Sequence, residues 1–450
     1  MANELSAKMN GISPEMVKRF SDNNRAQGLN QTIKNAIMKN GIDAATENNA
    51  AIVAMNQVFS EEIKTGKVTN QKQSGRCWMF AALNTFNHHL TDLFNLKDFE
   101  LSQNHTNFWD KFEKSNFFLE SIIETASEPL EGRLVSHLLS TPQQDGGQWD
   151  MLVSLVQKYG VVPKQVMPET FQSERSGRLN AILNTTLRED ALKLRSLHSQ
   201  GRSQEEIQNV KEDMLADIYK ILSLSLGEPP TAFDFEFRDE DGEFHREQGI
   251  TPQAFYQKYV GLNLDDYVSI INAPTKDKPY GKTYTVQFLG NVVGGKPIKY
   301  LNVDMETLKQ VAINQIKDNE SVWFGCDVGK YSNSQYGIMD TDLYQYEEAF
   351  GFPFQMTKAE RLDYKSSIMT HAMVLTGVNL VEGKPTRWKV ENSWGEKAGK
   401  KGYFVMSDKW MDEYTYQVVV NKKYLSDDLK AALEQEPIEL KPWDPMGSLA

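Results

Sequence analysis

Apolar residues recur at helical spacing directly after residue 76. The positions concerned are Trp78, Phe80, Ala81, Ala82, Leu83, Phe86 and Leu90. They lie on most sides of a helix, and a helix that is apolar on most of its sides is buried. The pattern therefore predicts a largely buried helix that begins at Cys77, with Gly75 supplying the sharp turn into it.

Two apolar stretches in the C-terminal third, residues 370–377 and 388–395, are typical of strands. The turn-like sequence Glu382-Gly383-Lys384-Pro385 lies between them. An antiparallel hairpin folded at this turn returns Asn392 to the same end as His371. We therefore expect these two side chains to lie side by side.

The whole chain divides into five stretches by composition and periodicity. We expect a helical N-terminal segment over 1–65, a lobe with the Cys77 helix over 66–169, and a charged helical hairpin over 170–230. A strand-rich lobe over 231–425 and a tail over 426–450 follow. The hairpin is interpreted as an insertion for subunit contacts, and a solvated excursion is the alternative.

The tail combines a short helix with a stiff, extended end. Ser426 begins a helix to about Glu434, and three later prolines predict an extended, non-helical path to Ala450. A frayed end is the usual fate of such a segment. Its apolar side chains are suited instead to docking in a groove: Trp443, Met446 and Leu449.

The chemistry of these elements centres on one thiol. Backbone N–H groups and the macrodipole at a helix N-terminus favour negative charge, so we expect the pKa of Cys77 to lie below the roughly 8.5 of a free cysteine. His371 is the candidate base, and the amide oxygen of Asn392 is placed to accept its second N–H. Trp394 would cover this pair.

Each of these residues has a plain structural alternative. A cysteine in an apolar segment is more often an inert core residue, and Cys326 is predicted to be one, in a buried strand. His371 alone is equally consistent with a core histidine, and Asn392 alone with a turn. Their joint occurrence in this chain order favours a catalytic set.

Several motifs together resemble one enzyme family. They are Gln71 to Trp78, Leu101-Ser102-Gln103 with Asn107-Phe108-Trp109-Asp110, residues 145–149, residues 323–329, the segments around His371 and Asn392, and the tail. This set resembles the papain-like cysteine peptidases, and more narrowly their aminopeptidase C and bleomycin hydrolase branch. Ser74 stands where secreted members carry a disulfide cysteine, and Arg76 replaces a small residue.

The resemblance implies an α+β, papain-like fold of two lobes, one helical and one β-barrel-like, with a helical insertion and a C-terminal arm. It implies that Cys77 attacks the scissile carbonyl, and that Gln71 and the Cys77 backbone N–H form the oxyanion hole. Gly146 and Gly147 would let substrate backbone approach closely, and Trp394 would also border the substrate site. The carboxylate of Ala450 would meet the α-ammonium group of the substrate.

The function that the resemblance implies is cytosolic cysteine aminopeptidase activity on peptides with free amino termini, without metal or cofactor. Bleomycin hydrolase-like amide hydrolysis also stays open. The family further implies a homohexamer with active sites facing an internal cavity. Two alternatives remain: an endopeptidase with an undocked tail, and a catalytically silent binding protein on the same scaffold.

Composition agrees with an intracellular enzyme. The 450 residues are 40% apolar and include two cysteines, too few for a disulfide scaffold. The start, Met1 to Ser6, lacks the features of a signal peptide, and no apolar run is long enough to span a membrane. A net charge of −12 without a basic run makes nucleic-acid binding an unfavoured expectation.

Two apparent metal motifs are weak. Adjacent His88 and His89 lack the i, i+4 spacing of paired zinc ligands on a helix. The acidic run Asp239-Glu240-Asp241-Gly242 lacks the first and last ligands of a calcium loop, so a hairpin tip between two strands is expected there. Metal binding is therefore not predicted.

Overall fold

The computed structural model describes residues 10–26 and 31–450, which fall into two compact units. The smaller unit combines the chain up to Val53 with Asp342–Gln355, a grouping that the predicted 1–65 segment did not include. Its helices are α2 (Pro14–Ala26), α3 (Gln31–Asn40), α4 (Ile42–Thr46), α5 (Asn49–Ala54) and α15 (Tyr346–Phe350). The extreme start, where a signal peptide was judged absent, lies outside the described residues.

The two parts of the smaller unit are joined by backbone and side-chain bonds. Glu47 forms an antiparallel bridge with Tyr344. The Tyr346 hydroxyl donates to Asp43 Oδ1 at 2.8 Å. These contacts tie together segments that are about 300 residues apart in the sequence.

The larger unit, Ala54–Thr341 with Met356–Ala450, is built on one long mixed sheet. The sheet order is β14-β5-β6-β4-β13-β7-β10-β11-β12-β9-β8, with β1 beside β10, and β2 pairs with β3 in a separate hairpin. The strands are β1 (Glu61–Glu62), β2 (Phe233–Arg238), β3 (Phe244–Ile250), β4 (Tyr267–Ile271), β5 (Lys282–Val286), β6 (Tyr300–Asn302), β7 (Val322–Cys326), β8 (Ser332–Asn333), β9 (Ile338–Met339), β10 (His371–Val381), β11 (Lys384–Glu391), β12 (Tyr403–Ser407), β13 (Thr415–Asn421) and β14 (Ile438–Leu440).

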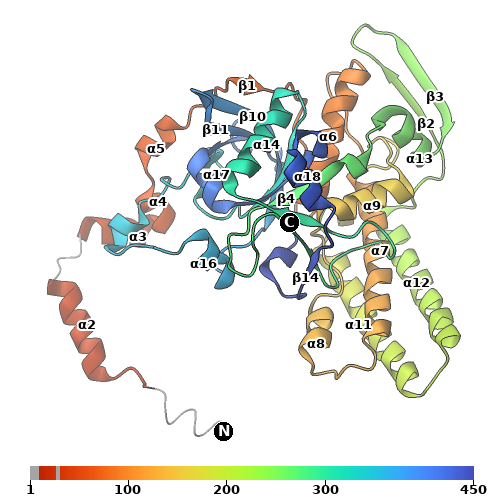
Figure 1. Cartoon of the computed structure of the whole chain (residues 1–450), viewed down its shortest axis with the longest axis horizontal. Helices are drawn as coiled ribbons and strands as arrows, with labels where there is room; N and C mark the ends of the chain where they lie inside the picture. Colours follow the sequence, from red (N-terminus) through yellow and green to blue (C-terminus); the bar gives the residue numbers. More distant parts are fainter. Residues whose placement is uncertain (1–9, 27–30) are drawn as a thin grey trace. The chain divides into compact units, whose positions relative to one another are not determined.

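Some helices pack against this sheet, and others pack together beside it (Figure 1). They are α6 (Cys77–Leu93), α7 (Gln103–Glu124), α8 (Arg133–Ser140), α9 (Trp149–Tyr159), α10 (Phe171–Glu174), α11 (Gly177–Ser199), α12 (Gln204–Leu226), α13 (Pro252–Phe255), α14 (Met305–Lys317), α16 (Lys358–Asp363), α17 (Asp408–Tyr414) and α18 (Asp427–Leu433). The predicted buried helix at Cys77 is confirmed as α6.

Two separate apolar clusters define two lobes within the larger unit. One cluster gathers side chains of α6, α7, α9, α11 and α12 with the side chains that β4 to β7, β10 and β13 turn toward these helices, and we call this the helical lobe. The other gathers side chains of β7, β10 to β13, α14 and α17, and we call this the β lobe. The predicted α+β fold is confirmed.

Each end of the larger unit contributes residues to the core of the lobe that the other part of the chain mainly forms. Ile63, shortly before α6, is buried in the cluster of the β lobe. The tail residues Leu440, Met446 and Ala450 are buried in the cluster of the helical lobe. Each core is therefore completed by a segment from the opposite end of the unit.

The predicted hairpin over 170–230 contains two long antiparallel helices. Helices α11 and α12 pack against α7 and against each other. Ser203 and Glu206 form the expected capping box at the start of α12. Leu192 and Leu224, on these helices, have exposed fractions of 74% and 81%.

The tail follows the prediction at its start and departs from it near its end. Ser426 caps α18, as expected. One turn of 3-10 helix over Pro445–Gly447 contradicts the predicted absence of helix. Proline is tolerated in the first turn of a helix, and the Asp444 side chain accepts from the Met446 backbone N–H at 2.8 Å.

The predicted hairpin tip at 239–242 is confirmed, because it joins β2 to β3. Over residues 10–26 and 31–450, none of the helices combines the length and apolar character that crossing a bilayer requires.

Candidate active site

Cys77 is the first residue of α6 and only 3% of it is exposed. The Gly75 backbone N–H, just before it, donates to Asp145 Oδ2 at 2.8 Å. A Cβ on Gly75 would lie 3.0 Å from the Asp145 Cβ, so a larger residue would require Asp145 to shift by a few tenths of an ångström. The chain bends at Ser74 and Gly75, as predicted for the entry to the helix, and the left-handed residue of the preceding loop is Lys72, with φ of 55°.

His371 and Asn392 lie side by side at one end of the β10–β11 hairpin. The hairpin turns at Glu382 and Gly383, both with positive φ, as the turn sequence predicts. His371 Nε2 lies 2.9 Å from Asn392 Oδ1, and both residues are buried. Since the Nε2–H donates to this amide oxygen, Nδ1 is the ring nitrogen left for Cys77.

The thiol approaches the same end of the hairpin. The backbone N–H of Ala372, next to His371, interacts with the Cys77 sulfur. The Trp394 ring centroid lies 4.9 Å from that of His371, so the indole covers the imidazole as expected. Cys326 is buried in β7, paired in register with His371, as predicted for a strand residue.

Gln71 is held against the segment that follows Asn392. Its backbone N–H donates to Ser393 O at 2.8 Å, and its Oε1 accepts from Ser393 Oγ at 2.6 Å. Its Nε2 donates one hydrogen to Ser74 O at 2.7 Å. The side-chain amide is thereby oriented, with its second hydrogen left for another acceptor. The role of Ser393 was missed, because nothing in a single sequence pairs it with Gln71.

Burial dominates the acid–base properties of the pair. Desolvation raises the pKa of Cys77 to about 11, although the backbone N–H groups of Ala372, Trp78 and Cys77 act to lower it. Desolvation lowers the pKa of His371 to about 4, against the opposing effect of the Asn392 hydrogen bond. The expected low pKa of Cys77 is therefore wrong for this state, because the helix terminus is outweighed by loss of water.

The tail lies along the predicted substrate-binding glycines. Gly147 N donates to Ala450 O at 3.1 Å, and Ala450 N donates to Gly147 O at 3.3 Å. Gln148 Nε2 donates to Ser448 O at 2.8 Å. A Cβ on Gly147 would lie 2.4 Å from the Trp78 ring, and one on Gly146 would lie 2.9 Å from Leu449 Cβ.

Two further contacts fix the tail. Lys278, 3% exposed at its side chain, forms an ion pair with Asp444 at 3.0 Å. The Arg133 guanidinium stacks on the Trp443 ring, 3.9 Å from its centroid. The predicted docking of the tail's apolar residues is confirmed by these contacts and by burial of Met446.

Buried charged side chains hold the segment that contains Gly146 and Gly147. Lys114 Nζ donates to Gly146 O at 2.7 Å and to Asp110 Oδ2 at 2.6 Å. Lys111 Nζ donates to Asp145 Oδ1 at 2.8 Å. Burial acts to raise the pKa of Asp145, but the Lys111 ammonium and hydrogen bonds hold it well below its usual range. Sequence reasoning missed this network, whose one visible signal is the i, i+4 pair of Asp110 and Lys114.

Metal ligands do not gather in the part of the chain that the structure describes: no group of three or more histidine, cysteine or acidic side chains there is arranged to hold an ion. The arrangement that is present consists of a thiol, an imidazole with a fixed tautomer and an oriented amide. These groups suit nucleophilic attack on a carbonyl followed by proton transfer to a leaving group.

Comparisons with known proteins agree with this chemistry. The model of the Peptidase C1-like family matches residues 11–447. Aminopeptidase C of Listeria monocytogenes serovar 1/2a is 61% identical over 436 residues, covering 97% of this chain and 98% of the relative. Aminopeptidase C of Lactobacillus delbrueckii subsp. lactis is 52% identical over 442 residues, covering 98% of each chain.

A solved structure extends the agreement to three dimensions. The crystal structure of PepW from Lactobacillus rhamnosis HN001 superposes with a TM-score of 0.97 at 57% identity, covering 98% of this chain and 99% of that one. The resemblance inferred from the motifs is confirmed. The chain belongs to the Peptidase C1-like family, within the aminopeptidase C branch of the papain-like cysteine peptidases.

Proposed function

We propose that Cys77, His371 and Asn392 carry out the reaction of this cysteine-type aminopeptidase. The observation that carries the proposal is the His371–Asn392 hydrogen bond of 2.9 Å at the N-terminus of the helix that begins with Cys77. The interaction of the Cys77 sulfur with the backbone N–H of Ala372, next to His371, further supports it.

The steps follow from the groups present. The Cys77 thiol passes its proton to His371 Nδ1 as the sulfur attacks the scissile carbonyl carbon. The resulting oxyanion accepts hydrogen bonds from the Cys77 backbone N–H and from the free hydrogen of Gln71 Nε2. The C–N bond then breaks as His371 protonates the leaving amine. Water attacks the thioester, His371 takes its proton, and the free acid leaves as the thiol is restored.

The raised pKa of Cys77 and the lowered pKa of His371 favour the neutral thiol and imidazole in the resting site. The thiolate then forms as part of the attack, when the substrate carbonyl and the oxyanion donors receive the charge. Trp394 keeps water away from the hydrogen bond between His371 and Asn392. Water at this place would loosen the orientation of the imidazole ring.

We assign exopeptidase selectivity to the tail. Its backbone pairing with Gly147 occupies the path that residues preceding the scissile bond would otherwise follow. Ala450 is 4% exposed, and Gly147 supplies one hydrogen bond to its terminal oxygen. A carboxylate buried to this degree gains much from a cation, which the α-ammonium group of a substrate supplies. The docked tail also disfavours the endopeptidase alternative.

The deciding experiment compares a fluorogenic aminoacyl amide that has a free amine with its N-acetylated form. The intact enzyme should cleave only the free-amine substrate, and alkylation of Cys77 should abolish that activity. A variant shortened by residues 447–450 should also cleave the acetylated substrate. Loss of activity in Cys77→Ser, with retention in Cys326→Ala, separates the catalytic thiol from the other buried one.

Each contrary result removes a different part of the proposal. A fully active Cys77→Ser variant would exclude thiol catalysis. A shortened enzyme that still rejects acetylated substrates would exclude the tail as the determinant of selectivity. A folded, intact enzyme that cleaves neither substrate would favour the silent-scaffold alternative.

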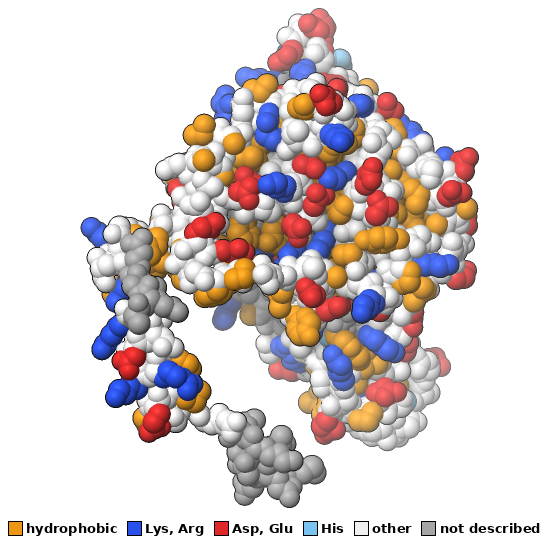
Figure 2. Space-filling view, turned by 60° about the vertical axis from the view of Figure 1, so that its left-hand side comes forward, with side chains coloured by type: hydrophobic (Ala, Val, Ile, Leu, Met, Phe, Trp, Pro, Cys, Tyr) orange, Lys and Arg blue, Asp and Glu red, His pale blue; other side chains and the backbone are white. Residues whose placement is uncertain are grey.

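We further propose self-association as a homohexamer and a cytoplasmic location. The exposed apolar residues of α11 and α12, Ile182, Leu192 and Leu224, support self-association through this hairpin. The two unpaired cysteines fit a reducing compartment. Figure 2 shows basic and acidic side chains interspersed over one face, which supports the expectation that nucleic acid is not a partner. Light scattering that gives a stable 51.3 kDa monomer would exclude the hexamer.

A further inference from the structure

A hydrogen-bonded cluster fastens the catalytic helix to the residue before Asn392. Asn84 Nδ2 donates to Glu391 Oε1 at 3.0 Å, and His88 Nε2 lies 2.8 Å from Glu391 Oε2. Asn84 and His88 are i, i+4 neighbours on α6, so one face of the helix holds both carboxylate oxygens. Glu391 is 4% exposed, and these contacts compensate the burial of its charge.

The same cluster reaches the two segments that flank the site. His88 Nδ1 lies 3.0 Å from Ser321 Oγ, at the start of β7. Asn84 Nδ2 also donates to Thr69 Oγ1 at 3.1 Å, and Thr69 O accepts from the Gly395 N–H at 3.0 Å. The Glu391 carboxylate accepts, so the Nε2–H of His88 donates to it, and in the neutral ring Nδ1 accepts from the Ser321 hydroxyl.

We propose that Glu391, held by Asn84 and His88, is a positioning residue that sets the separation between Cys77 and the His371–Asn392 pair. The proposal rests on the catalytic roles assigned above. Cys77 and the two holding residues belong to one continuous helix, whereas Glu391 is bonded directly to Asn392. Any shift between α6 and the hairpin must therefore break this cluster.

The cluster bridges the two lobes, because α6 belongs to the helical lobe and β11 to the β lobe. A further contact between α6 and the sheet lies next to the thiol, where Trp323 Nε1, on the side of β7 that packs on the helical lobe, donates to Trp78 O at 3.0 Å. The Glu391 cluster is the charged bridge and the one that adjoins Asn392. A displacement of about 1 Å in a reacting group can cost about 100-fold in rate, so such a bridge acts on the chemical step.

The carboxylate is required by the donors around it. Both Glu391 oxygens accept hydrogen bonds, so replacement by glutamine would turn an amide N–H₂ either toward the donor Nδ2 of Asn84 or toward His88, which would accept only after its proton moves to Nδ1. Glu391→Gln therefore preserves volume while breaking one contact. A glutamine at position 88 could still donate to Glu391 and accept from Ser321.

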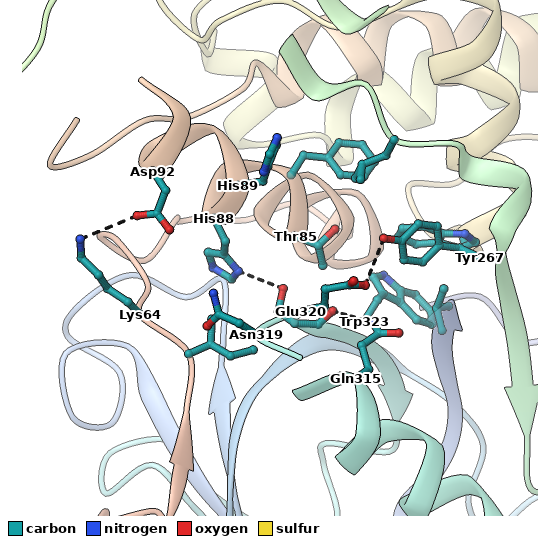
Figure 3. A pocket seen from close by; sticks show the side chains of 16 residues that line it. Lys64, Thr85, His88, His89, Asp92, Tyr267, Gln315, Asn319, Glu320 and Trp323 are labelled. Carbon is teal, nitrogen blue, oxygen red and sulfur yellow. Dashed lines mark hydrogen bonds and ion pairs between the residues drawn. The ribbon is translucent and has the colours of Figure 1, made fainter. Parts of the chain in front are cut away.

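The side chain of His88 borders open space, so it can be replaced by a smaller one. It lies on the wall of a pocket of about 250 Å³, together with Lys64, Asp92 and Glu320 (Figure 3). His89 points in a different direction from His88 in this view and is exposed. Removal of the His88 ring therefore opens onto solvent rather than leaving a sealed cavity, and His89 offers a matched control on the same helix.

The experiment measures kcat and KM on the free-amine amide, together with the melting temperature, for His88→Ala, His88→Gln, Glu391→Gln and His89→Ala. We expect His88→Ala and Glu391→Gln to lose about 10- to 100-fold in kcat, with KM changed less than about two-fold, because binding groups are untouched. His88→Gln should recover most of kcat, and His89→Ala should match the intact enzyme.

Asn392→Ala separates this inference from the proposed function. If Asn392→Ala loses activity while folded His88→Ala and Glu391→Gln keep full kcat, the positioning role is overturned and the catalytic set stands. If Asn392→Ala keeps full activity, the catalytic assignment itself fails. A kcat loss in His88→Ala that only follows its unfolded fraction, or that His88→Gln does not rescue, would reduce the cluster to a structural one and overturn the inference.

Discussion

Gly147 and Ala450 exchange two backbone hydrogen bonds: the Gly147 N–H donates to the terminal oxygen of Ala450 at 3.1 Å, and the Ala450 N–H donates to the carbonyl oxygen of Gly147 at 3.3 Å. This is the pairing of residues directly opposite each other in an antiparallel ladder. The last residue of the sequence therefore occupies a fixed register beside the segment proposed to bind substrate.

A fixed register makes the length of the tail critical. Addition of one glycine after Ala450 would move the terminal carboxylate by about 3.3–3.6 Å along an extended chain. We expect kcat/KM for the free-amine amide to fall at least about 10-fold, because the carboxylate leaves the position at which we propose that it binds the α-ammonium group. Ala450→Gly, which keeps the length, should retain activity, and an equally active extended enzyme would contradict the fixed register.

Gly146 and Gly147, in the segment proposed to bind substrate, should respond differently to an added methyl group. In Gly147→Ala the new Cβ meets the rigid Trp78 ring at 2.4 Å, whereas in Gly146→Ala it meets Leu449 Cβ of the tail at 2.9 Å. We expect Gly147→Ala to lose about 1–3 kcal/mol of stability. Gly146→Ala should displace only the last residues of the tail, Leu449 and Ala450, with a smaller loss of stability, and allow cleavage of N-acetylated substrate.

Thermal unfolding of the two variants and the ratio of acetylated to free-amine cleavage provide the measurements. A Gly146→Ala variant with unchanged selectivity would show that the tail tolerates the methyl group in place.

Alkylation of Cys77 should depend on pH in a way that reports its burial. The thiolate is the nucleophile, and desolvation raises the pKa of Cys77 to about 11, so the rate with iodoacetamide should rise most steeply near pH 11. His371, with a pKa of about 4, is neutral throughout the neutral range and adds no positive charge to lower that value. A midpoint below about 8.5 would indicate a resting thiolate–imidazolium pair instead. Circular dichroism at each pH serves as the control for folding.

The ion pair beside Cys77 should contribute to stability in a non-additive way. Arg76, fully buried at its side chain, binds Glu169 through two hydrogen bonds of 2.7 and 3.2 Å. Removal of one partner, as in Arg76→Met or Glu169→Met, should cost about 3–5 kcal/mol because a charge is left buried and unpaired.

The double variant Arg76→Met with Glu169→Met should lose much less than the sum of the single ones. Urea unfolding of all four proteins measures this coupling. Additive losses would mean that the two side chains act independently.

The elements of the site that could be predicted are those with local signals. Helix α6 follows from apolar spacing after Cys77, and the hairpin follows from two apolar stretches about the Glu382-Gly383 turn. Because a hairpin's register depends on its turn, the contact between His371 and Asn392 could be inferred without any knowledge of the rest of the fold.

The remaining features depend on segments that meet only in three dimensions. Asp145 is held by Lys111 and Asn180, each more than 30 residues away, and no periodic pattern connects them. The pKa of Cys77 was mispredicted for the same reason: the helix N-terminus is visible in the sequence, but desolvation sums the contributions of all surrounding elements. The grouping of Asp342–Gln355 with the N-terminal segment likewise has no local signal.

The crossing of the two chain ends between the lobes has a consequence for any attempt to divide the molecule. Ile63 completes the core of the β lobe, and Leu440, Met446 and Ala450 complete that of the helical lobe. A single cut in the sequence therefore cannot separate two self-sufficient halves, because each fragment would carry away a piece of the other's interior. A split version of this protein should therefore regain its fold when the two fragments are expressed together, because each fragment then supplies the core residues that the other lacks.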